Sequence, residues 1–217
     1  MKKLLLGLLL FAIPSMAYVP DGTITPVKLA TGSFSPAGIL NAGFSVSVAA
    51  NAMTVTLKQS DGVTAPTTVS PVTIGFRSST AATGGGSQVT IASSISITVP
   101  ASTTLGTVST AAEYIYIYMM NNSGTGELAL SVNGLFDQGA VASSSAISGG
   151  SSRSTLYSTS ARSNLSIRLI GRIKITEVTA GTWASAPTEV TAQPYLFSQL
   201  TSNASTLMKM NYVQDTA

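Results

Sequence analysis

Apolar and polar residues alternate with a period of two along most of the chain, and no window holds a sustained 3.6-residue apolar repeat. Such alternation is typical of half-buried β-strands. The clearest alternating segments are Phe44–Val48, Met53–Lys58, Val72–Arg77, Gln88–Ile91, Ser94–Val99, Glu113–Met120 and Glu127–Val132. Turn-forming clusters separate them, as in sandwiches and barrels. The pattern predicts an all-β protein with an antiparallel β-sandwich or jelly-roll-like domain.

The residues between these segments predict several connections. Ser60-Asp61-Gly62 is a turn signal, and Asn121–Gly126 predicts a hairpin whose loop is longer than two residues. The Ser79–Ser87 loop contains three consecutive glycines (84–86), which resemble a linker because no Gly-Lys-Ser/Thr follows them. The Ser- and Gly-rich stretch Val141–Ser154 predicts a flexible loop or hinge.

The second half of the chain holds one long strand-like region and a different tail. Leu165–Ile170 and Arg172–Thr176 flank Gly171, and a glycine in such a run is typical of a β-bulge or a close backbone approach. The tail predicts either a short helix or a frayed end. Its helical stripe would comprise Tyr195, Leu196, Gln199, Leu200, Asn203, Leu207 and Met210.

The first seventeen residues have the order of a secretory signal peptide. Met1–Lys3 is basic, Leu4–Ile13 is apolar, and Ser15-Met16-Ala17 offers small residues at a cleavage position. The apolar run is too short for a bilayer, which needs about 20 residues. We expect cleavage after Ala17 and export to the extracellular space, cell surface or periplasm, without a membrane span. A buried N-terminal core strand is the alternative.

Composition narrows the possible chemistry. The 217 residues include no Cys and no His, only 9% are charged, and 60 are Ser or Thr. These absences exclude disulfides, thiolate zinc sites and Ser-His-Asp triads, so we expect no enzyme, no catalytic residue, no cofactor and no metal centre. The eight carboxylates are scattered without calcium-loop spacing, and we expect them on the surface, although an ion held between loops stays open.

Charge argues against nucleic acid as a partner. The net charge of +3 falls to +1 once Lys2 and Lys3 leave with the signal peptide. Five of the nine remaining basic residues gather late in the chain, without an aromatic-interleaved basic stripe. They are Arg153, Arg162, Arg168, Arg172 and Lys174. We expect them on an exposed sheet face or in pairs at a subunit contact.

Aromatic residues are the candidates for ligand contact. Period two places Tyr114, Tyr116 and Tyr118 on one strand face, which suits either a ligand-binding row or a central buried strand with hydroxyls at its rim. Trp183 lies in a loop-like segment that either packs on the sheet or contacts a ligand. The ligand-binding candidates are Tyr116, Tyr118, Tyr157 and Trp183.

Three groups of segments, in this order, resemble a phage tail-fibre or virion-type β-domain, as in secreted fibre-like adhesins. The first is Asp21–Leu29. The second is Ile97–Thr107 with the tyrosine strand and Gly126–Leu130, and the third is Leu156–Arg162, Ile167–Ile175 and Ala180–Pro187. The resemblance implies a lead segment at residues 18–32, a β-domain at 33–192 and a tail at 193–217. It also implies a homotrimer used for attachment, and it brings no catalytic residues.

Three hypotheses for function follow. The first is a secreted, non-enzymatic fibre-tip or adhesin-like module that recognises a cell-surface polymer, with a glycan preferred over a surface protein. The second is a structural virion, tail or surface component without a ligand of its own. The third is a polysaccharide depolymerase. The signal peptide favours the first, because phage structural proteins assemble in the cytoplasm and normally carry none.

Overall fold

The computed structural model describes residues 38–78 and 86–193. This part of the chain is all-β, as predicted, with a single short 3-10 helix. The strands are β1 Ile39–Leu40, β2 Gly43–Ala49, β3 Ala52–Lys58, β4 Val72–Arg77, β5 Gly86–Ile91, β6 Ser96–Val99, β7 Ala112–Asn122, β8 Thr125–Ser131, β9 Val141–Ala146, β10 Tyr157–Ser158, β11 Arg162–Thr176 and β12 Glu189–Ala192. The helix is η1, Phe136–Gly139.

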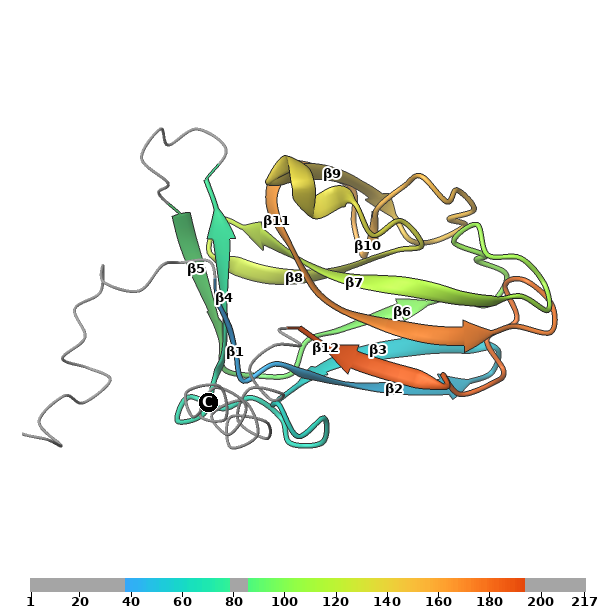
Figure 1. Ribbon diagram of the computed structural model, residues 1–217, viewed down its shortest axis with the longest axis horizontal. Helices are drawn as coiled ribbons and strands as arrows, with labels where there is room; N and C mark the ends of the chain where they lie inside the picture. The colour runs from blue at the N-terminus through green and yellow to red at the C-terminus, as the bar shows by residue number, and fades with distance from the viewer. Residues whose placement is uncertain (1–37, 79–85, 194–217) are drawn as a thin grey trace, which may run out of the picture. The chain divides into compact units, whose positions relative to one another are not determined.

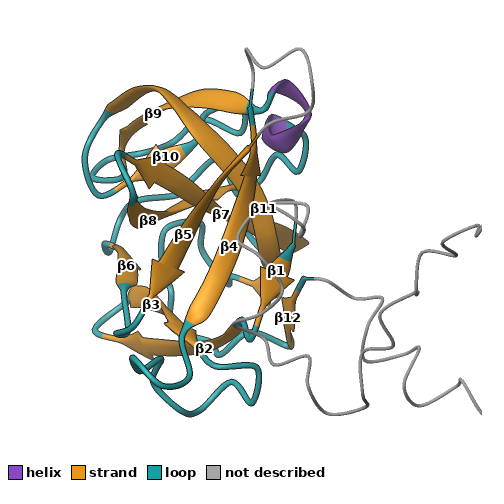
Figure 2. Cartoon of the chain, turned by 90° about the vertical axis from the view of Figure 1, so that its left-hand side faces the viewer, coloured by secondary structure: helices purple, strands orange, loops and turns teal. Residues whose placement is uncertain are grey.

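The strands form three sheets (Figure 1). Sheet A has the order β1-β4-β5, sheet B the order β2-β3-β6, and sheet C the order β12-β11-β7-β8-β10-β9. An additional pairing of β11 with β9 closes β11, β7, β8, β10 and β9 into a barrel-like ring. Figure 2 shows β4 and β5 in front of β7, β8 and β11, where β4 contacts β11 and β5 contacts β8.

Two predicted connections were wrong. The 121–126 segment is a two-residue turn, because Asn122 pairs with Thr125 across the β7–β8 hairpin. Ser123 and Gly124 both have positive φ (52° and 90°), as a primed turn between twisted strands requires. The Asn121 carboxamide oxygen accepts a 2.8 Å hydrogen bond from the Gly124 N–H, which stabilises this tight turn.

The predicted hinge at Val141–Ser154 was also wrong in its first half, which is strand β9. β9 pairs with both β10 and β11, and the buried hydroxyls of Ser144 and Ser158 are 2.6 Å apart. The following loop is fastened as well, since the Tyr157 hydroxyl accepts hydrogen bonds from the backbone N–H groups of Ser151 and Ser152. Serine hydroxyls here join strands instead of loosening a linker.

Two apolar clusters lie on opposite faces of sheet C. The main core gathers side chains from all three sheets, including Phe44, Leu57, Ile74, Phe76, Ile115, Ile117, Ile173 and Ile175. The small core lies within the closed ring and comprises Tyr118, Met120, Ala129, Leu156 and Ile167, with Leu165 and Leu169 against it. Strand β7 separates the two, because its successive side chains point to opposite faces.

A β-bulge lets β11 serve both clusters, as the glycine at position 171 predicted. Register with β7 shifts between Leu169 and Gly171, so Leu169 pairs with Tyr118 and Gly171 pairs with Ile117. The extra residue, Ile170, is fully buried in the main core. Figure 1 shows β11 curving from beside β9 to beside β12. Before the bulge its apolar side chains enter the small core, and after it they enter the main core.

The predicted signal peptide, lead segment and C-terminal helical stripe lie outside the described residues, as do residues 79–85 of the predicted loop. Within the described ranges, no helix has the length and apolar character needed to cross a membrane.

We predict that Gly171→Ala destabilises the fold by about 1–3 kcal/mol, because overpacking forces neighbours to move. A Cβ at this position would lie 2.5 Å from Cε2 of Phe44 and 2.6 Å from the backbone oxygen of Thr191. Urea denaturation measures the loss. Gly139→Ala is the control, since its Cβ would meet nothing within 4 Å. Equal effects of the two substitutions would contradict the close-packed bulge.

Candidate ligand-binding site

The three tyrosines of β7 share one face of the strand, as predicted, but not one environment. Tyr118 is fully buried, whereas Tyr114 and Tyr116 are half-buried. The strand carries this face out of the small core and onto the surface. The row therefore combines both alternatives: a buried core position at one end and accessible aromatic surface at the other.

Tyr118 is a core residue. Its hydroxyl donates a 2.6 Å hydrogen bond to the backbone oxygen of Asn133, and its ring meets that of Phe136 edge-on at a centroid distance of 6.0 Å. Burial raises the pKa of the phenol above its usual value, so it stays protonated at all ordinary pH. The side chain has no exposed surface with which to contact a ligand in this arrangement.

Trp183 and Tyr157 are also buried, at 0% and 5% exposure. The Trp183 indole N–H donates to the backbone oxygen of Thr103 at 2.9 Å, which ties the 177–188 loop to the 100–107 loop. Trp183 thus packs a loop against the sheets, which was one of its two predicted roles. Of the four predicted ligand-binding residues, only Tyr116 lies at an accessible pocket.

Four side chains on the outer face of sheet C form the tyrosine face: Tyr114, Tyr116, Arg172 and Lys174. Register places Arg172 beside Tyr116 and Lys174 beside Tyr114. The Arg172 guanidinium carbon lies 4.6 Å from the Tyr114 ring centroid, and the Lys174 ammonium lies 5.6 Å from it. Both distances permit cation–π attraction. The bulge creates this arrangement, because it turns Arg172 and Lys174 outward and Ile173 inward.

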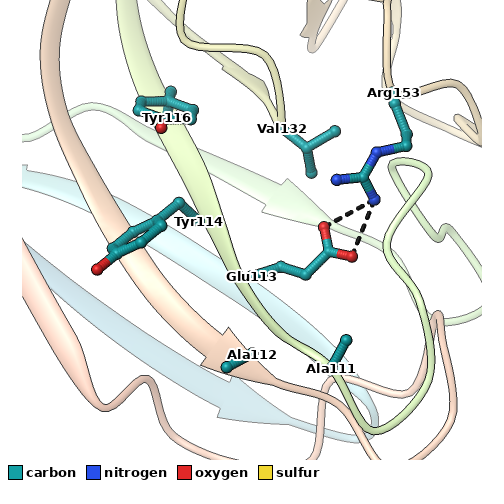
Figure 3. A pocket seen from close by; sticks show the side chains of 7 residues that line it. All are labelled: Ala111, Ala112, Glu113, Tyr114, Tyr116, Val132 and Arg153. Carbon is teal, nitrogen blue, oxygen red and sulfur yellow. Dashed lines mark hydrogen bonds and ion pairs between the residues drawn. The ribbon is translucent and has the colours of Figure 1, made fainter.

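A pocket of about 340 Å³ adjoins the tyrosine face (Figure 3). Figure 3 shows the two tyrosine rings on one side of β7 and the Glu113 carboxylate pointing to the other, toward Arg153. Arg153 and Glu113 form a 2.8 Å ion pair, and Arg153 also donates to the backbone oxygen of Gly106. Val132 and the small residues Ala111 and Ala112 complete the lining.

Four ion pairs between arginine and carboxylate side chains of the described residues hold these side chains in place. The pairs are Arg77–Asp137, Arg153–Glu113, Arg162–Glu127 and Arg172–Glu189. Hydrogen bonds from Thr191 and Arg172 lower the pKa of Glu189, so the carboxylate stays charged and holds Arg172. The structure thus pairs three of the late basic residues inside the chain.

Glu177 departs from the predicted surface position, since it is only 3% exposed. Its carboxylate accepts hydrogen bonds from the Thr107 hydroxyl and the Gly181 N–H. It therefore joins the loop that contains Thr107 to the loop that contains Gly181. Burial nevertheless dominates and raises the pKa of Glu177, with a smaller contribution from the charge of Glu113. Thr107, which contacts this carboxylate, lies 70 positions earlier in the chain, and the local sequence around Glu177 gives no signal of such a contact.

The tyrosine face and the adjoining pocket together offer aromatic area, oriented hydrogen-bond donors and one carboxylate, Glu113, which already accepts from Arg153. In the parts of the chain that the structure describes, no three acidic side chains gather closely enough to hold a metal ion. Comparison with protein-family models, with curated proteins and with solved structures finds no match for this chain.

Sequence reasoning missed Tyr114, Glu113 and Arg153 as pocket residues. Tyr114 shares the period-two signal of Tyr116, so the same pattern was available for it. Arg153 meets Glu113 only through the path of the 147–156 loop, which no local motif encodes.

We predict that Glu177→Gln changes the pH dependence of stability. A carboxyl whose folded pKa is raised binds its proton more tightly when folded, so its stabilising contribution is complete below the unfolded pKa and decreases as pH rises through the folded pKa. The stability of the native chain relative to the Gln variant should therefore fall as the pH rises above the ordinary glutamate pKa of about 4. Urea denaturation across this range measures it, and parallel pH curves for the two proteins would contradict the burial of a titrating carboxyl.

Proposed function

We propose that this protein is an exported, non-enzymatic binding module of the fibre-tip or adhesin type, which recognises a cell-surface glycan through its tyrosine face. The observation that carries the proposal is the pair of half-buried tyrosines, Tyr114 and Tyr116, beside a pocket lined by the Glu113–Arg153 pair. The resemblance to tail-fibre domains and the signal peptide at residues 1–17 support the same proposal.

The chemistry of the site fits a sugar. Tyrosine presents a flat apolar surface for the CH groups of a pyranose ring and a hydroxyl at its rim. Arginine and carboxylate side chains offer donors and acceptors to sugar hydroxyls. The ion pairs Arg153–Glu113 and Arg172–Glu189 hold these side chains before a ligand arrives, which reduces the entropy lost on binding.

We also propose that the main core is a β-sandwich variant in which sheet B faces sheet C, and that sheet C closes its far side through β9 and β10. We further propose that the module acts as a homotrimer. Trimerisation would stabilise a chain without Cys by burying additional apolar surface.

A structural role without a ligand is the second candidate, and one observation favours it. Val108 and Val178 lie on two loops and are 55% and 74% exposed. A hydrogen bond from the Thr110 N–H to the backbone oxygen of Glu177 joins these two loops. Exposed valines on adjoining loops suit contact with a neighbouring protein copy. A polysaccharide depolymerase is less well supported, because the described pocket lining holds a single carboxylate, Glu113.

We predict that Tyr116→Ala weakens glycan binding about tenfold or more, because the stacking surface is removed. A glycan array identifies a ligand, and isothermal titration then measures its dissociation constant for each variant. Tyr118→Phe is the matched control: it removes one buried hydrogen bond, costs about 1 kcal/mol of stability and leaves binding unchanged. No binding to any glycan, or equal losses in both variants, would overturn the proposal.

We also predict that the exported chain is a trimer at micromolar concentration. Size-exclusion chromatography with light scattering measures the mass directly. A monomer across the accessible concentration range would exclude the trimeric part of the proposal and leave a single-site module.

A further inference from the structure

Lys174 forms none of the close ion pairs of the described residues, although it lies opposite Glu189 on β12 and its charge acts on that carboxylate. The four ion pairs of the described residues use Arg77, Arg153, Arg162 and Arg172, and none includes Lys174 or Lys58. Lys58 lies on sheet B and does not line the pocket, whereas Lys174 lies on the tyrosine face. Of the two lysines among the described residues, Lys174 therefore belongs to the proposed binding surface.

The charge of this surface is positive overall. The tyrosine face and the adjoining pocket hold three cations, Arg153, Arg172 and Lys174, and the two carboxylates that the arginines engage, Glu113 and Glu189. Three cations against two carboxylates leave one positive charge in excess, because Arg172 and Lys174 share Glu189. Lys174 is half-buried beside the Tyr114 ring, and the excess positive charge of this face attracts an anion.

The position of Lys174 fits a ligand that also stacks on Tyr116. The two residues are diagonal neighbours on adjacent strands, because Lys174 pairs with Tyr114 and Arg172 pairs with Tyr116. Diagonal neighbours in a sheet lie about 7–8 Å apart, a distance that long side chains bridge. One sugar ring on Tyr116 would thus carry an acidic substituent, or a neighbouring acidic sugar, within reach of the Lys174 ammonium.

From this geometry we propose that the ligand is an anionic polysaccharide, whose acidic group contacts Lys174 while its sugar ring packs on Tyr116. The inference rests on the proposed function, and it specifies the class of glycan that the same face binds. A uronate carboxylate and a sugar sulfate share the required chemistry, namely a negative charge fixed to a pyranose ring. The stacking surface distinguishes such a polymer from an acidic polypeptide, which offers charge without a sugar ring.

The experiment measures binding of the full chain to four polymers by isothermal titration at low and moderate salt. Dextran sulfate and dextran share one backbone and differ in charge, polygalacturonate supplies the carboxylate, and polyglutamate supplies charge without sugar. We expect the acidic polysaccharides to bind at least about tenfold more tightly than dextran or polyglutamate do, and we expect their affinity to fall with added salt. Comparison of dextran sulfate with polygalacturonate identifies which acidic group is preferred.

Two lysine variants make the test specific. Lys174→Gln should weaken binding of the acidic polysaccharide about three- to tenfold and reduce its salt dependence. Lys58→Gln removes the same charge from the opposite sheet and should change neither. Because both lysines lie on strand surfaces, both variants keep the fold, which thermal unfolding verifies.

Each outcome has one meaning. Tight binding to dextran that depends on Tyr116 and not on Lys174 would overturn this inference and leave the proposed function in place. Equal effects of Lys174→Gln and Lys58→Gln, or equal binding of polyglutamate, would reduce the charge effect to a general attraction and overturn it as well. Absence of binding to these four polymers and to every glycan on the array would overturn both proposals.

Discussion

The bulge at Ile170–Gly171 is the constraint on which the rest of the structure depends. Without the bulge, strict alternation along the same residues would place Ile167, Leu169, Ile173 and Ile175 on one face of β11. The bulge sends the first two into the small core and the last two into the main core. One strand therefore supports two hydrophobic clusters on opposite faces of the same sheet. The glycine is needed because no Cβ fits between Phe44 and β12.

The same shift creates the candidate site. Once Ile173 points into the main core, its neighbours Arg172 and Lys174 must point outward, and register places them beside Tyr116 and Tyr114. The closed ring then buries the continuation of the tyrosine row, where Tyr118 anchors η1 and the 132–135 loop. Fold and surface chemistry are thus coupled: the bulge that lets β11 serve both clusters also decides which of its side chains join the tyrosine face.

Much of this fold was predictable from alternation, and some of it was not. The positions of β2, β3, β4 and β7 follow the period-two pattern closely, and Gly171 marked the bulge. The Ser123–Gly124 turn was missed because serine seldom adopts positive φ, and β9 was missed because its serines resemble a linker. Short strands such as β10 and β12 form only because longer neighbours offer them an edge.

The site was less predictable than the fold, because it depends on pairings between distant segments. Periodicity placed Tyr116 and Tyr118 on one face without revealing that the ring of strands covers only the second. The indole of Trp183 looked available in a loop, yet its partner Thr103 lies 80 residues earlier. Register between β7 and β11, which no local motif encodes, decides that Lys174 faces Tyr114.

The central claim is that the tyrosine face binds the ligand. Nuclear magnetic resonance of the full chain with labelled tyrosines, titrated with a polygalacturonate oligomer, tests it directly. The account predicts that the ring signals of Tyr114 and Tyr116 shift with oligomer concentration, while those of buried Tyr118 and Tyr157 stay in place. Shifts confined to other tyrosines, or equal shifts throughout, would contradict it.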